Sequence, residues 1–132
     1  MRLLDVDDDI GLWSWIGVAL RLSHVGWLAQ RLRQGLNALF AQLGLDWVAY
    51  GEFSGFKLLP NYRGPRPDAD GFLAYQGPAE QPKDPGLVHA FRCAMLLNGV
   101  DLPGLGGMTT AAHREADVDR TVTAVSEALY LL

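Results

Sequence analysis

The stretch that most constrains the fold is the end of the chain, residues 91–132. Residues 91–97 are almost wholly apolar and stop at Asn98-Gly99, a pair that commonly ends a helix through a left-handed residue. A short apolar step over 100–102 predicts a strand, and Pro103-Gly104 predicts a turn. A second strand and a final helix complete a predicted helix, strand, turn, strand, helix unit.

The final helix is predicted from both its charges and its spacing. Its first turn is acidic, with Glu115, Asp117 and Asp119, which suits the positive end of a helix dipole. One face carries apolar residues at helical spacing, namely Val118, Val122, Val125, Leu129 and Leu132. This face is expected to pack on the rest of the domain.

Two segments of the chain carry a family resemblance. Residues 95–100 read Met-Leu-Leu-Asn-Gly-Val, and residues 111–121 read Ala-Ala-His-Arg-Glu-Ala-Asp-Val-Asp-Arg-Thr. Together they resemble the C-terminal segment of the class III aminotransferases that depend on pyridoxal phosphate, and most of all the glutamate-1-semialdehyde aminomutase branch. Residues 28–40 are similar to the helix that opens the small domain of that family.

The resemblance implies a C-terminal small domain over residues 24–132, preceded by an apolar helix over residues 1–23 that is expected to dock on a large domain. It gives structural roles to five positions of the family motif, which are Asn98, Gly99, His113, Asp117 and Asp119. We expect His113 to be structural and the two aspartates to stabilise the first turn of the last helix.

The remaining elements follow from local patterns. Residues 25–43 predict an amphipathic helix with Gly44 as its C-cap, and residues 46–50 and 52–59 predict strands. Residues 60–86 are rich in proline and glycine and predict a long irregular connection with an apolar island over 72–75. The predicted fold class is therefore α+β, a small antiparallel sheet covered by helices.

The helix over residues 25–43 is expected to bury one stripe and expose the other side. Its apolar face is formed by Val25, Leu28, Leu32, Leu36, Leu39, Phe40 and Leu43. The side chains predicted to turn away from the core are Gln30, Arg31, Arg33, Gln34 and Asn37.

The apolar N-terminal run over residues 10–20 is too short to be read as a membrane anchor. A bilayer needs about 20 apolar residues, and Arg21 interrupts the run. Asp7, Asp8 and Asp9 precede it, which is the wrong sign for a signal peptide and is best read as a solvated capping region. We expect this helix to be covered by other protein, not by lipid.

Composition excludes several function classes. A net charge of −4 without a basic cluster argues against nucleic acid as a partner. Cys93 is the single cysteine, so no intrachain disulfide is possible, and a cytoplasmic location fits best. We expect Cys93 to be a buried structural thiol without an acid–base partner. His24, His89 and His113 show no metal-ligand spacing, and no metal is expected.

The catalytic groups of the resembled family are not apparent in this sequence. A Schiff base with pyridoxal phosphate needs a suitably placed lysine, and the chain has only Lys57 and Lys83. Lys57 lies in a predicted strand and Lys83 in the proline-rich connection, and neither stands in the family's Schiff-base motif. The resemblance implies that the lysine, the acidic partner of the pyridine nitrogen and the phosphate donors belong to a large domain. No cofactor is therefore expected on this chain alone.

Two departures from the family pattern bear on the assignment. Arg114 occupies the position where the family usually has a helix-capping Thr, which should cost about 1 kcal/mol unless Thr110 or His113 replaces the cap. The segment over residues 101–107 is short and carries no Glu, which argues against the aminomutase reaction in particular. Arg63 and Arg66, on the long connection, are candidates for contacting an anionic substrate or a neighbouring subunit, although solvated arginines are commoner there.

Two hypotheses about function remain open. The chain is either the C-terminal part of a class III transaminase or aminomutase, inactive alone because its catalytic domain is missing, or a stand-alone interaction module derived from the same fold. In the first case its partner is the large domain, and in the second a full-length homologue or a second copy in a homodimer. Whether the chain is itself an enzyme is left undecided, with no catalytic residue expected.

Overall fold

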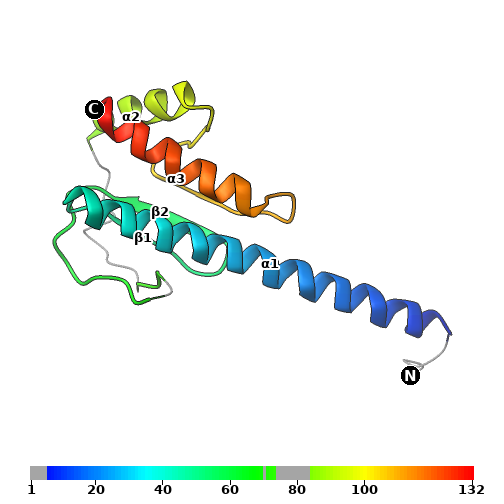
Figure 1. Cartoon of the computed structure of the whole chain (residues 1–132). Helices are drawn as coiled ribbons and strands as arrows, with labels where there is room; N and C mark the ends of the chain where they lie inside the picture. The colour runs from blue at the N-terminus through cyan, green and yellow to red at the C-terminus, as the bar shows by residue number, and fades with distance from the viewer. Residues whose placement is uncertain (1–5, 70, 74–83) are drawn as a thin grey trace.

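A computed structural model describes residues 6–69, 71–73 and 84–132, with side chains described from residue 14 onward. The elements follow the order α1 (Val6–Leu43), β1 (Val48–Tyr50), β2 (Gly55–Leu59), α2 (Pro85–Leu97), β3 (Gly106–Met108) and α3 (Glu115–Tyr130). The predicted α+β class is confirmed, because three helices accompany a three-stranded antiparallel sheet over the described residues (Figure 1).

Helix α1 is a single element of 38 residues that crosses the expected boundary between residues 23 and 24 without a break. It ends where the sequence predicts, at Gly44, whose φ of 66° is the left-handed conformation that glycine adopts without steric cost. The backbone N–H of Leu45 then donates to the carbonyl of Phe40 at 2.9 Å, which satisfies one of the free carbonyls of the last turn.

The sheet has the order β1-β2-β3, with Ala49 paired to Leu58 and Phe56 paired to Gly107. The second predicted strand begins at Gly55 and not at residue 52, because residues 52–54 form the turn. Phe53 in this turn has a φ of 51°, and the N–H of Gly55 donates to the carbonyl of Glu52. The left-handed conformation of Phe53 and the hydrogen bond to Glu52 therefore reverse the chain, and residues 52–54 do not extend β2.

The prediction of a strand over residues 100–102 is wrong. The N–H of Val100 donates back to the carbonyl of Met95 at 3.1 Å, and the N–H of Gly99 donates to Leu96 at 3.0 Å. This pair of bonds is the Schellman arrangement that closes a helix, so Val100 takes part in the cap of α2 and not in a strand. The strand that follows α2 in the described residues is β3, over Gly106–Met108.

Alternation along β1 and β2 divides the core between the two faces of the sheet. Ala49, Phe56 and Leu58 face the main core with α1, α2 and α3, whereas Val48 and Leu59 lie in a second cluster with Tyr50, Tyr62 and Leu73. In the main core Trp47 packs between Phe40 and Phe91, with ring centroids 5.7 Å from each. These rings join α1, the start of β1 and α2.

The predicted apolar faces of α1 and α3 are largely confirmed. Val25, Leu28, Leu32, Leu36 and Phe40 are buried, and so are Val118 and Val125. Leu132 is an exception, since it follows the end of α3 and is exposed. In the packing, α1 contacts β1, β2 and α3, and α2 lies against α3 (Figure 1).

The prediction that Arg33 turns away from the core is wrong. Its side chain is only 4% exposed, and its guanidinium donates to the carbonyls of Phe53 at 3.1 Å and Gly55 at 2.7 Å. Asn37, also expected to face away, exchanges two hydrogen bonds with the backbone of Ala49. The sheet covers this side of α1, and polar side chains there bind strand and turn backbone that would otherwise lack partners.

The N-terminal half of α1 extends beyond the rest of the fold, as Figure 1 shows. Large apolar side chains on it are exposed to solvent, including Trp15 at 73% and Leu20 at 66%. Asp7, Asp8 and Asp9 lie in its first turn. Over the described part of the chain, no helix combines the length and the apolar character that crossing a membrane requires.

Candidate functional pocket

A pocket of about 380 Å³ lies between α1, the sheet and the start of α3. Its walls come from residues far apart in the chain, with Leu32 from α1, Phe56 from β2, Met108 from β3 and Val118 from α3. The rest of its lining is formed by Val100, Asp101, Leu102, Pro103, Gly106, Gly107, Thr109, His113, Asp117 and Thr121. The lining is mainly apolar with a few polar groups, and both this character and the volume are typical of small-molecule sites.

Most polar groups of the lining already bind other parts of the chain. The hydroxyl of Thr109 is buried and donates to the carbonyl of Val25 at 2.7 Å, which ties the end of β3 to α1. The hydroxyl of Thr121 donates to the carbonyl of Asp117 at 2.7 Å, one turn earlier in α3. Both hydroxyls are therefore already bound to backbone carbonyl groups of α1 and α3.

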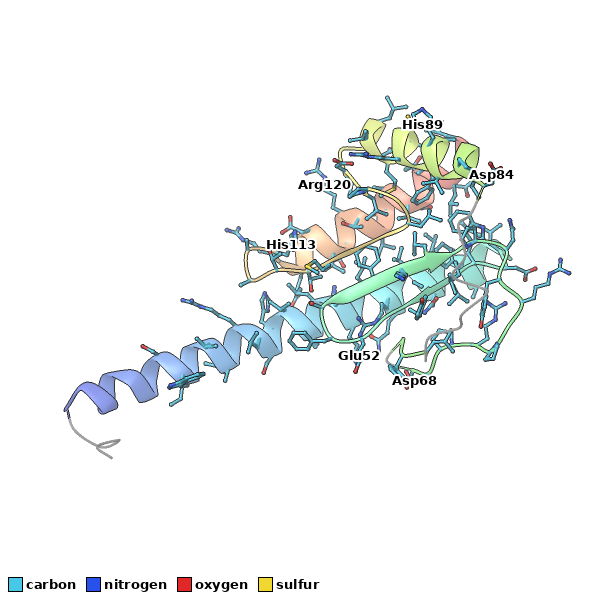
Figure 2. All side chains as sticks on the ribbon, turned by 180° about the vertical axis from the view of Figure 1, so that it is seen from behind. Glu52, Asp68, Asp84, His89, His113 and Arg120 are labelled. Carbon is cyan, nitrogen blue, oxygen red and sulfur yellow. The ribbon has the colours of Figure 1, made fainter. Side chains whose placement is uncertain are left out.

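The turn between β3 and α3 is organised around His113, which Figure 2 labels just before the start of α3. Its ring atom Nδ1 accepts a hydrogen bond from the backbone N–H of Thr110 at 2.9 Å, and the backbone N–H of His113 donates to the carbonyl of Thr110 at 3.1 Å. An accepting Nδ1 requires the neutral tautomer with the proton on Nε2. The imidazole Nε2 of His24 in α1 lies 3.1 Å from the carbonyl oxygen of His113. The histidine thus lies in a closed turn that is attached to α1.

Helix α3 begins without a hydroxyl cap, since its N-cap residue is Arg114. An arginine side chain has no acceptor atom, so it cannot bind the free N–H groups of the first turn. The carboxylate of Asp117 instead accepts from the backbone N–H of Arg114 at 2.8 Å, the half of a capping box that an acidic third residue provides. Neither Thr110 nor His113 takes over the cap.

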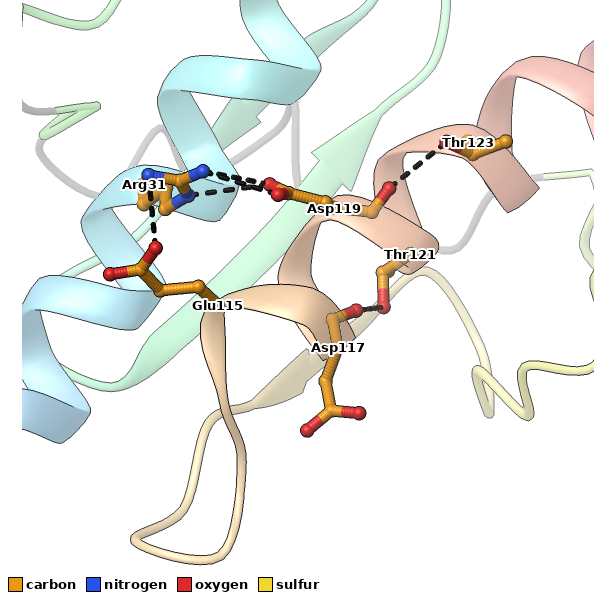
Figure 3. A network of polar contacts seen from close by, with 6 residues as sticks. All are labelled: Arg31, Glu115, Asp117, Asp119, Thr121 and Thr123. Atoms are coloured by element: carbon orange, nitrogen blue, oxygen red, sulfur yellow. Dashed lines mark hydrogen bonds and ion pairs between the residues drawn. The ribbon is translucent and has the colours of Figure 1, made fainter.

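Asp119 and Glu115 face α1 instead of the pocket. The guanidinium of Arg31 donates to the Asp119 carboxylate at 3.1 and 3.2 Å and lies 3.9 Å from Glu115 (Figure 3). The same guanidinium lies over the ring of Trp27, 5.7 Å from its centroid. This cluster joins the exposed edges of α1 and α3, and partial solvent exposure limits its contribution to stability.

Asp101 at the rim of the pocket is paired with Arg92 of α2. Two hydrogen bonds of 2.9 and 3.1 Å join the guanidinium to the carboxylate. This hydrogen bonding, helped by the charge of Arg92, lowers the pKa of Asp101 below its ordinary value and raises the pKa of Arg92. The pair closes the segment that follows α2 against the side of that helix.

Asn98 and Gly99 lie at the end of α2. The side-chain amide of Asn98 donates to the carbonyl of Ala94 at 2.9 Å, and Gly99 has a φ of 82°. A Cβ atom at residue 99 would lie 2.7 Å from the guanidinium of Arg120, so the position is constrained by both its conformation and its neighbour.

The structure does not bring Arg63 and Arg66 to the pocket. Both are exposed and pair with Asp46 just after α1, at 3.3 and 3.8 Å respectively. Asp46 also accepts a backbone hydrogen bond from Tyr62 through its carbonyl. The two arginines therefore lie where the long connection begins.

The prediction of a buried Cys93 without a partner is wrong. Cys93 is exposed, and its Sγ lies 3.7 Å from Nε2 of His89. The buried face of α2 carries Phe91, Ala94 and Met95, which leaves residues 89 and 93 together on the outer face. The four-residue spacing of this pair was the signal in the sequence that could have revealed the contact.

The lining of this pocket does not offer the groups that hold pyridoxal phosphate. The pocket lining has no lysine for a Schiff base and no arginine or lysine for a phosphate group, whereas it contains two aspartates. Lys57 is an exposed residue of β2, and Lys83 lies outside the described residues. In the same part of the chain, no group of three His, Cys, Asp or Glu side chains is placed to hold a metal ion.

No profile of a known protein family and no curated protein sequence matches the chain. Solved structures do match it. A glutamate-1-semialdehyde aminomutase from Pseudomonas aeruginosa PAO1 is similar at 23% identity with a TM-score of 0.68. An omega-transaminase from Sphaerobacter thermophilus is similar at 18% identity with a TM-score of 0.66, and a transaminase with PLP bound has a TM-score of 0.62.

Each match covers 84% of this chain but only 23% or 24% of the other chain. The structural likeness thus agrees with the aminotransferase resemblance found in the sequence motifs. At these identities it establishes the fold, and the chain spans about a quarter of the length of the structures that it matches.

Proposed function

We propose that this chain is the C-terminal small domain of a class III aminotransferase that depends on pyridoxal phosphate. The observation that carries the proposal is the asymmetry of the structural matches, which cover 84% of this chain and about a quarter of the transaminase and aminomutase chains. The motifs over residues 95–100 and 111–121 support the C-terminal placement. In this role the domain forms one wall of the substrate cleft.

The chemistry belongs to a large domain in this proposal. The pocket of the small domain offers apolar surface and carboxylates, but no lysine for the Schiff base. The isolated chain is then inactive, and the cofactor is held by the partner. Arg63 and Arg66 remain candidates for contacting an anionic substrate group or a second subunit across the cleft.

The exposed part of α1 is the surface that the large domain would cover. Trp15, Leu20 and Leu22 are all at least half exposed, and Leu20 lies on the opposite side of the helix from the other two. A helix that is apolar on all sides is typically buried by surrounding protein. Residues 1–23 therefore act as the docking segment, and residues 24–132 as the small domain.

The first test is the coding DNA upstream of the Met1 codon. We expect either an open frame that continues into a large domain with a Schiff-base lysine, or a neighbouring gene that encodes such a domain. The second test is co-purification of that large domain with the chain. Trp15→Asp with Leu20→Asp should abolish the complex, whereas Leu97→Asp, at an equally exposed apolar site on α2, should preserve it. Absence of any such domain would contradict the proposal.

A stand-alone interaction module is the second candidate. The observation in its favour is a complete core, with no buried side-chain nitrogen or oxygen left without a hydrogen bond among the described residues. Such a module would use the exposed apolar surface of α1 to bind a full-length aminotransferase or a second copy of itself. Light scattering after gel filtration separates the two cases. A discrete monomer or dimer favours the module, and aggregation favours a domain separated from its partner.

A further inference from the structure

We draw no further inference here: the strongest candidate, the exposed pair of His89 and Cys93 on the outer face of α2, rests on a single cysteine beside one histidine, and no third His, Cys, Asp or Glu in the described part of the chain is placed to complete a metal site with them.

Discussion

Phe91 connects the last unit of the fold to the first, and its removal should be the most damaging single truncation of a side chain in α2. The ring is fully buried and packs on Trp47 with centroids 5.7 Å apart, while Trp47 packs on Phe40 of α1. Helix α2 otherwise contacts mainly α3. Phe91→Ala therefore leaves a cavity at the point where α2 meets the start of the sheet.

The expected loss has two parts. Transfer of a buried Phe side chain out of water is worth about 1.5–3 kcal/mol, and the unfilled cavity adds to this, so Phe91→Ala should cost about 3–5 kcal/mol. A tilted aromatic pair adds about 0.5–1.5 kcal/mol beyond its buried area, which places the cost toward the upper end. Phe91→Leu fills much of the cavity and should cost about 1–2 kcal/mol.

Urea unfolding followed by tryptophan fluorescence measures both variants, because Trp47 reports directly on this contact. The matched control is Phe72→Ala, at a half-exposed ring, which should change the free energy of unfolding by less than about 0.5 kcal/mol. If Phe91→Ala costs no more than Phe72→Ala, the ring does not pack as described and the placement of α2 is wrong.

Three further predictions concern single sites. The pKa of Asp101 is lowered in the folded state, so its pair with Arg92 should stabilise the fold fully above the ordinary pKa of 3.8. This stabilisation should be lost as the pH falls through the lower pKa of the folded state. Asp101→Asn should therefore reduce the loss of stability at acid pH in urea unfolding, and an unchanged acid dependence would contradict the pairing. Gly99→Ala should destabilise the chain by about 1–2 kcal/mol in urea unfolding because of its left-handed φ, whereas Gly17→Ala, in open space within α1, should be neutral or stabilising. Cys93 should react with a thiol reagent in the native state, and a reaction that needs denaturant would show that it is buried after all.

Local signals in the sequence predicted most of the elements. The apolar spacing of residues 25–43 and the Gly44 stop identified the second half of α1, and the Asn98-Gly99 pair identified the end of α2. These signals work because helix periodicity and left-handed exits are properties of neighbouring residues. The first half of α1, apolar on all sides, was read correctly as helix.

Predictions failed where a distant element decided the environment of a residue. Arg33 lies on a side of α1 that looks polar in the sequence, yet the turn at residues 53–55 covers it and takes its hydrogen bonds. Cys93 lies in an apolar stretch, yet the buried face of α2 is set by α3 and Trp47, which leaves the thiol outside. Burial on a helix depends on what packs against it, and the local pattern does not contain that information.

The candidate site shows the same division. The sequence by itself indicated the acidic first turn of α3 and the aminotransferase resemblance, because each depends on residues that lie close together in the chain. Only the tertiary structure placed Leu32 and Phe56 opposite Val118, bound Asp101 to Arg92, and separated Asp117, which faces the pocket, from Asp119, which faces α1. A pocket exists only where several elements meet, so its position follows from the packing of helices on the sheet and not from any one segment.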